Sequence, residues 1–417
     1  MKKYINRTIK VIVFMLIFCI SFEYSFGVRG VMKMGTDVTN VSYYNTFYDL
    51  PKNCIDGIVL GNSVAHRGWC DVTAWNESGM AVYSLASESQ PVPLMKYIIK
   101  EARKTQDIKF VVIDIHGMRS NVFYFPSETF IRRVTDIMPM SANRVDTVNA
   151  AYDYFNKIAK SKENVLKKRK IKTADLEKDA LLFPFMKYHA RWQDLTRDDF
   201  IDCTSQVMST YTGWHMCEIS KMDIAAAEAE KPNKFGYTDE AGGLTEYQIE
   251  SFTDLLDYLK KEDIPAVFVS FPTKATKAEQ MQLNQTIDII KNFDYDKFSV
   301  VNMNTKDVYY QEDTGLNAEL KIDWKNDFYG KDHVNSYGSE KTTKYLMNHI
   351  LERFDIKDKR GEKAYKTWDK AYDNYVKLMQ AGWEKVEETS PEYYDHRTGG
   401  WDDSTWRQYM EEILNSK

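Results

Sequence analysis

The sequence predicts an α/β protein: a doubly wound parallel sheet with a helical insertion, preceded by one N-terminal membrane-anchor helix. Short apolar runs that do not alternate with polar residues indicate strands buried on both faces, as in a parallel sheet. Segments with helical apolar spacing separate these runs, which is the order of a doubly wound fold. The expected strands are 55–60, 80–84, 110–115, 266–271 and 299–301.

The N-terminus has the layout of a secretory signal or signal anchor, in which basic residues precede an apolar run. The apolar run covers 11–22 and reaches spanning length, about 20 residues, only when it is extended to Val28 across Glu23. No small-residue cleavage site follows, so the pattern favours an uncleaved single-pass anchor. The positive flank would stay in the cytoplasm and the rest would be extracellular. The flank consists of Lys2, Lys3, Arg7 and Lys10.

Composition excludes several classes of function. The 417-residue chain has a formal net charge of −5, which gives no sign of nucleic-acid binding. Neither a P-loop nor a dinucleotide-binding glycine pattern is present, and no acidic or histidine cluster has metal-ligand spacing. We therefore expect no cofactor and no metal. The five cysteines lack zinc spacing, although Cys54 with Cys70, or Cys203 with Cys217, could pair outside the cell.

The chain divides into five predicted parts. Residues 1–28 form the anchor, 29–119 the first part of the α/β domain, 120–243 a mostly helical insertion, 244–356 the second part of the domain, and 357–417 an appendage. A long insertion of this kind usually builds a lid or a wall of the cleft. In the appendage, aromatic residues recur at helical spacing over 365–379. This stripe favours packing onto the body over a polymer-binding platform.

Ser63 is the candidate nucleophile. It follows the first predicted strand and the turn-forming pair Gly61-Asn62, at the point where a helix begins. Reacting groups gather at the carboxyl ends of strands in such sheets, and the amides of a following helical turn can hold an oxyanion. Alternatively, Ser63 merely caps the helix, because serine and asparagine are preferred caps.

His333 is the candidate general base. It lies in the polar loop between the last predicted strand and a final helix expected to begin at Ser339. In a doubly wound sheet this loop falls on the same edge as Ser63, so the imidazole could accept the serine proton. Asp332 is the first candidate for the acid that orients His333, Asp327 is the alternative, and a serine–histidine dyad stays open.

These motifs together resemble the SGNH hydrolases. The resemblance rests on Gly61-Asn62-Ser63, on the loop Asp332-His333-Val334-Asn335, and on their order in the chain. With the anchor and the insertion segment 188–192, the chain looks more narrowly like the extracellular DltD-like branch, which accompanies membrane-bound O-acyltransferases. The similarity covers about residues 50 to 355. It implies an SGNH-like (flavodoxin-like) fold, with Ser63 as nucleophile and His333 as base.

The sequence departs from that family at two places. The family usually places the acid three residues before the histidine, and Gly330 occupies that position here. It also takes oxyanion-hole donors from a later glycine and asparagine, and no asparagine stands at the equivalent place before Asn121. Asn62 and Gln90 are the candidate donors in this chain.

The resemblance implies a membrane-anchored extracellular serine acyltransferase or esterase. A membrane O-acyltransferase would supply an acetyl or D-alanyl group, and a cell-wall or secreted polysaccharide would carry the ester. The alternative is a catalytically inactive SGNH-fold scaffold that binds polymer and docks the acyltransferase. The Gly330 departure and the missing oxyanion-hole asparagine motivate this alternative.

Overall fold

The computed structural model describes residues 2–28, 30–33, 47–124, 127–168, 176–197, 199–200, 235–330 and 332–389. Its centre is a five-stranded parallel sheet with the order β2-β1-β3-β4-β5. The strands are β1 (Gly57–Leu60), β2 (Val82–Ser84), β3 (Phe110–Asp114), β4 (Ala266–Ser270) and β5 (Phe298–Asn302). The predicted α/β class and parallel sheet are confirmed, and each predicted strand overlaps an observed one.

Helices cover both faces of the sheet, and the central strands β1, β3 and β4 are buried along their whole length. Ile58 and Val111 face one core with α5 (Met95–Ala102), α13 (Glu246–Lys261) and α14 (Lys277–Lys291). Val59 and Val112 face a second core with α3 (Ser63–Gly68), α4 (Asp71–Ser78) and α17 (Ser336–Arg353). The strand order reverses between β1 and β3, which is where ligands bind in open parallel sheets.

Two helices begin earlier than expected because polar caps precede their apolar positions. The capping box of Thr276 with Glu279 starts α14 at Lys277, where the apolar pattern indicated 281. Asn335 caps α17 at Ser336, three residues before the predicted start. The capping box predicted at Thr245 is present, with Gln248 as its partner.

The remaining short elements lie in the connections. After β2 comes η3 (Val92–Leu94), and after β3 come η4 (Ile115–Met118) and α6 (Ser120–Phe123). After β5 come α15 (Lys306–Tyr310), α16 (Gly315–Leu320) and the antiparallel pair β6 (Phe328–Gly330) and β7 (His333–Val334). The sequence predicted a polar loop where β6 and β7 form. Strands of two or three residues are too short for a period to be read.

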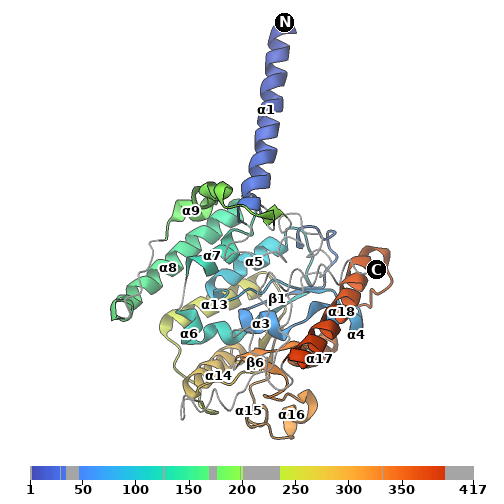
Figure 1. The fold of residues 1–417 in the computed structure, drawn as a ribbon. Helices are drawn as coiled ribbons and strands as arrows, with labels where there is room; N and C mark the ends of the chain where they lie inside the picture. Colours follow the sequence, from blue (N-terminus) through green and yellow to red (C-terminus); the bar gives the residue numbers. More distant parts are fainter. Residues whose placement is uncertain are drawn as a thin grey trace.

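The insertion is helical where the structure describes it, as the sequence predicted. Its elements are α7 (Glu128–Thr135), α8 (Ala142–Lys168), α9 (Lys178–Leu182), α10 (Phe185–Tyr188) and η5 (His189–Gln193). An isolated antiparallel bridge joins Phe235 to Thr276. Figure 1 shows α8 and α9 on the side of the body from which α1 emerges. Cys203 and Cys217 lie outside the described residues.

The N-terminal helix α1 (Lys2–Phe26) stands away from the body (Figure 1). It is long and apolar enough to cross a membrane or to serve as a signal sequence. The short helix η1 (Val31–Lys33) follows, and all three of its residues are buried. The ammonium group of Lys33 donates a hydrogen bond of 2.8 Å to the carbonyl of Asp136. The segment after α1 is therefore built into the insertion.

The appendage packs on the body through η7 (Lys363–Tyr365) and α18 (Lys366–Thr389). The Trp75 ring lies 5.4 Å, centroid to centroid, from the rings of both Tyr365 and Trp368. Tyr365, Trp368 and Tyr375 are buried, so the aromatic stripe is a packing surface. Trp401 and Trp406 lie outside the described residues. Cys54 is a buried free thiol, so a disulfide between Cys54 and Cys70 is not present.

Candidate active site

Ser63 is the first residue of α3 and follows the carboxyl end of β1. Gly61 makes the turn with a φ of +154°. A Cβ at Gly61 would lie 2.6 Å from the Cβ of Asp114 and from that of Ala65, so only glycine fits there. The turn before Ser63 thus lies close against Asp114, at the end of β3.

Two polar side chains hold this turn. The Oδ1 atom of Asn62 accepts a hydrogen bond of 2.9 Å from the amide of Val64 and caps α3. The Oε1 atom of Gln90 accepts one of 3.0 Å from the amide of Gly61. Both side chains are buried. Ser63 therefore sits on a fixed backbone, which suits a reacting group.

His333 comes to Ser63 from the other half of the chain. The Oγ atom of Ser63 and the Nε2 atom of His333 are 2.8 Å apart, although the two residues are 270 positions apart in the sequence. His333 lies in β7, and Asn335 directly after it caps α17 through the amides of Tyr337 and Gly338. The two candidates are thus brought together, within the hydrogen-bond reach that a nucleophile and its base require.

A second serine–histidine contact shows why position matters. The Nε2 atom of His349 lies 3.2 Å from the Oγ atom of Ser299, near the amino end of β5. Ligands of parallel sheets bind at the opposite, carboxyl edge. Only the Ser63–His333 contact has the topological position of an active site, so Ser299 and His349 provide a matched control pair.

The surroundings of His333 keep its imidazole neutral. Burial, together with the nearby cation of Arg67, lowers the pKa of His333 from 6.5 to about 3, while the charge of Asp332 acts in the opposite direction. The Tyr329 ring stacks on the His333 ring with centroids 5.5 Å apart. The guanidinium of Arg67 lies 5.4 Å from the Tyr329 ring centroid. An unprotonated imidazole is the form that can accept the serine proton.

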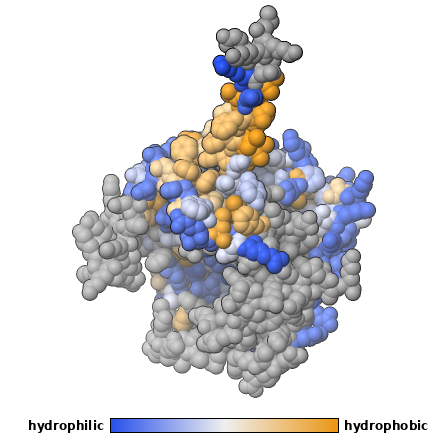
Figure 2. All heavy atoms as spheres, turned by 45° about the horizontal axis from the view of Figure 1, so that its top comes forward, coloured by the Kyte–Doolittle hydropathy of each residue, from blue (hydrophilic) through white to orange (hydrophobic). Residues whose placement is uncertain are grey.

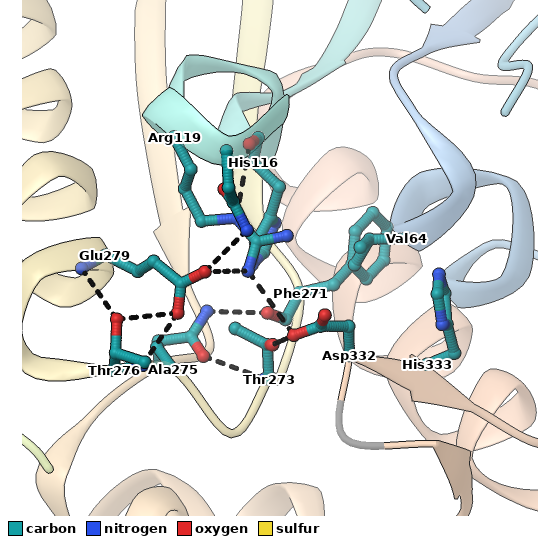
Figure 3. A network of polar contacts seen from close by, with 12 residues as sticks. Val64, His116, Arg119, Phe271, Thr273, Ala275, Thr276, Glu279, Asp332 and His333 are labelled. Atoms are coloured by element: carbon teal, nitrogen blue, oxygen red, sulfur yellow. Dashed lines mark hydrogen bonds and ion pairs between the residues drawn. The ribbon is translucent and has the colours of Figure 1, made fainter. Parts of the chain in front are cut away.

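Asp332 points away from His333 (Figure 3). Its Oδ1 atom accepts a hydrogen bond of 2.7 Å from the hydroxyl of Thr273, and the guanidinium of Arg119 lies 3.4 Å from the same oxygen. Arg119 is buried and also pairs with Glu279 at 3.8 Å. Figure 3 marks no hydrogen bond between Asp332 and His333. Adjacent side chains of an extended segment diverge, which explains this geometry.

Asp327, the alternative acid, is also engaged elsewhere. Its buried carboxylate accepts hydrogen bonds of 2.7 Å from the ammonium group of Lys341 and from the amide of Asp323. Burial raises the pKa of Asp327. These contacts fix the segment that leads into β6. Both candidate acids thus bind partners other than His333, and the contact that the structure gives for the imidazole is with Ser63.

Gln90 has a role different from the oxyanion donor that the sequence suggested. Its amide nitrogen donates to the carbonyl of Leu85 at 2.8 Å and to the hydroxyl of Ser87 at 3.3 Å. An amide has two N–H donors, so these contacts use both. The side chain instead joins the β2 loop to Gly61. Asn62 likewise uses its carbonyl oxygen as a helix cap.

Sequence reasoning missed a histidine–carboxylate contact beside the turn. The Nδ1 atom of His116 lies 2.6 Å from Oδ1 of Asp114, and both side chains are fully buried. Asp114 ends β3, and His116 is the second residue of η4. Their position after a central strand was the available signal. The roles of Arg119 and Thr273 had no such signal, because they depend on contacts with Asp332 across the fold.

Comparisons with family models and with curated proteins assign no family to the chain. No family model matches the chain, and no curated protein matches it.

Proposed function

We propose that the protein is a serine-dependent acyltransferase or esterase of SGNH type. The observation that carries this proposal is the 2.8 Å contact between Ser63 Oγ and His333 Nε2 at the carboxyl edge of the sheet. The strand order β2-β1-β3-β4-β5 is of the flavodoxin-like kind and supports the expected fold. The resemblance to the DltD-like branch supplies the reaction class.

The reaction divides into two balanced steps. Ser63 Oγ attacks the carbonyl carbon of an acyl ester while its proton passes to Nε2 of His333. The ester bond then breaks, and the leaving alcohol takes that proton, which leaves the acyl group on Ser63. In the second step a hydroxyl of the acceptor, or water, attacks the acyl–Ser63 ester and gives its proton to His333. Ser63 recovers the proton and the product ester or acid leaves.

The proposed location is the outer face of a cell membrane, with α1 as a single-pass anchor. The burial of Val31, Met32 and Lys33 supports retention of α1, because the residues directly after it are part of the fold. A membrane-bound O-acyltransferase would supply an acetyl or D-alanyl group. A cell-wall or secreted polysaccharide would be the acceptor or donor of the ester.

The test is covalent labelling of the full chain in detergent. We expect p-nitrophenyl acetate to add one acetyl mass to Ser63, and a fluorophosphonate to label the same residue, as mapped by peptide mass spectrometry. Ser63→Ala and His333→Ala should abolish both signals. Ser299→Ala and His349→Ala, which alter the other serine–histidine contact, should leave them unchanged. No label on wild-type Ser63 with either reagent would sink the proposal.

The alternative is a scaffold that keeps the fold without the chemistry. It is favoured by the contacts of Asp332 with Thr273 and of Asp327 with Lys341, which hold both candidate acids away from His333. Such a scaffold would bind polymer and dock the acyltransferase. Ser63→Ala would then leave the polymer's ester content unchanged in cells, whereas the enzymatic function requires that content to change.

A further inference from the structure

Four large apolar side chains are exposed on one short segment of the insertion. Phe183, Phe185, Met186 and Trp192, which we call the outer ridge, are exposed by 49%, 44%, 47% and 66%. Phe183 directly follows α9, Phe185 and Met186 lie on α10, and Trp192 lies on η5. Grouped exposed apolar side chains in a soluble domain mark an interaction surface.

The opposite side of the same segment is part of the core. Leu181 and Tyr188 are buried, and the Tyr188 hydroxyl donates a hydrogen bond of 3.1 Å to the carboxylate of Asp136. Lys187 pairs with Glu128 at 2.6 Å. The segment therefore has a fixed orientation, and the outer ridge faces outward because its inner side is already packed.

The outer ridge is continuous with α1. The ring of Phe185 lies 6.1 Å from that of Phe22 and 5.1 Å from that of Phe26, centroid to centroid. Figure 2 shows apolar surface running from the helix onto the adjoining face of the body. Whatever surrounds the outer end of α1 therefore also meets Phe185.

The length of α1 indicates what surrounds that end. The apolar run 11–22 gives about 18 Å of helix at 1.5 Å per residue, whereas the hydrocarbon core of a bilayer is about 30 Å thick. Arg7 and Lys10 limit the extension on the cytoplasmic side. The hydrocarbon must then extend outward toward Phe26. Glu23, in this stretch, interacts electrostatically with Lys33.

We propose that the outer ridge is a membrane-docking surface, which inserts into the outer interfacial layer of the bilayer that α1 spans. This inference rests on the proposed anchoring by α1. The amphipathic indole of Trp192 prefers this layer, and Phe185 adds apolar area on the same surface. The domain is then held by two contacts, the helix and the ridge, which fixes its orientation as well as its attachment.

Trp192 provides the test within the full-length protein. The chain is reconstituted in nanodiscs of phosphatidylcholine and phosphatidylglycerol, with or without bromine near the glycerol end of the acyl chains. The emission of Trp192 is the difference between wild type and Trp192→Phe. We expect brominated lipid to reduce it by about twofold or more, because the indole would lie at the depth of the bromines.

Trp324→Phe is the matched control. Trp324 is buried and lies just before β6, which is at the other end of the molecule from α1 in Figure 1. The emission lost in this variant should not respond to brominated lipid. A response equal to that of Trp192 would show general quenching and would overturn the assignment.

Cys19, which is exposed on α1, separates this inference from the proposed anchoring. Protection of Cys19 from a maleimide, mapped by mass spectrometry, together with quenching of Trp192 supports both. Protection of Cys19 without quenching of Trp192 overturns the docking surface and leaves the anchor, and the ridge is then free to contact a membrane protein. Full alkylation of Cys19 overturns both.

Discussion

The carboxylate of Asp332 is hydrogen-bonded to the hydroxyl of Thr273, although His333 is its neighbour in the chain. The bond is 2.7 Å long and joins the loop after β4 to the β6–β7 hairpin. Arg119, from the loop after β3, contacts the same carboxylate oxygen. Asp332 therefore ties three loops together at the carboxyl edge of the sheet. Its charge balances Arg119 and is not directed at the imidazole.

Asp332→Asn should slow fluorophosphonate labelling of Ser63 by less than about tenfold. Removing the acid of a formed triad costs about 10⁴-fold, because the histidine loses its orientation. Here the substitution removes the negative charge of Asp332, which contacts the guanidinium of Arg119. Labelling rates are compared with those of wild type and His333→Ala. A loss as large as that of His333→Ala would mean that Asp332 turns to His333 during the reaction.

Labelling of Ser63 should stay nearly constant from about pH 8 to about pH 5. The pKa of His333 is lowered to about 3, so the imidazole stays neutral across this range. An ordinary histidine, with a pKa near 6.5, would lose most of its neutral form. Arg67→Gln should move the acid limb of the pH profile to higher pH, because the cation of Arg67 helps to lower the pKa of His333. Arg103→Gln, which alters a surface pair with Glu262, is the control.

The lowered pKa of His333 also makes the folded state less stable at acid pH. Below about pH 6.5 the unfolded chain protonates His333 and the folded chain does not. The contribution of neutral His333 to the free energy of unfolding is therefore fully present above that pH and is lost as the pH falls toward 3. Urea unfolding of wild type and His333→Gln should show a smaller loss of stability on acidification in the variant.

Gln90→Leu distinguishes a structural role from an oxyanion contact. The substitution removes the hydrogen bond that the buried amide of Gly61 donates to Gln90 and the one that Gln90 donates to the carbonyl of Leu85. We expect a loss of about 1–3 kcal/mol in the free energy of unfolding for such buried groups. An oxyanion donor would behave differently, with a loss of about 10²–10³-fold in acyl transfer and little change in stability. Urea denaturation and acetylation rates are measured on the same samples.

Trp368→Ala should destabilise the fold by about 3–5 kcal/mol, the cost of removing a large buried ring. Trp368 is 1% exposed, and its ring lies 5.4 Å from that of Trp75 and 6.5 Å from that of Tyr83. Lys370→Ala, two residues further on, should stay within about 0.5 kcal/mol as a surface substitution. Equal midpoints of unfolding for the two variants would contradict the packing of α18.

Strands β1 to β4 were predictable because they are buried, and strands buried on both faces appear in the sequence as apolar runs. The run 266–271 matched β4 (Ala266–Ser270) within one residue. The closeness of Ser63 and His333 was predictable for a related reason. Ser63 follows the carboxyl end of the first strand, and His333 lies in the connection after the last strand of the sheet, which reaches the same edge. The direction of the Asp332 side chain was not predictable, because Arg119 lies 213 residues away and Thr273 lies 59 residues away. The sequence did not predict the outer ridge either, because the exposure of a side chain depends on what the rest of the chain covers.

If α1 is the proposed anchor, the docking of η1 determines how far Ser63 can reach from the membrane. A flexible linker of about 20 residues has an end-to-end distance of roughly 25 Å, so a domain on such a tether samples many heights and tilts. Here Lys33 is bonded to Asp136, and the carbonyl of Met32 accepts a hydrogen bond of 3.0 Å from Arg191. The body then follows the tilt of α1. Under the proposed function and anchoring, acyl donors and acceptors would have to come to one level above the lipid, and the protein would search for them only by diffusion in the plane.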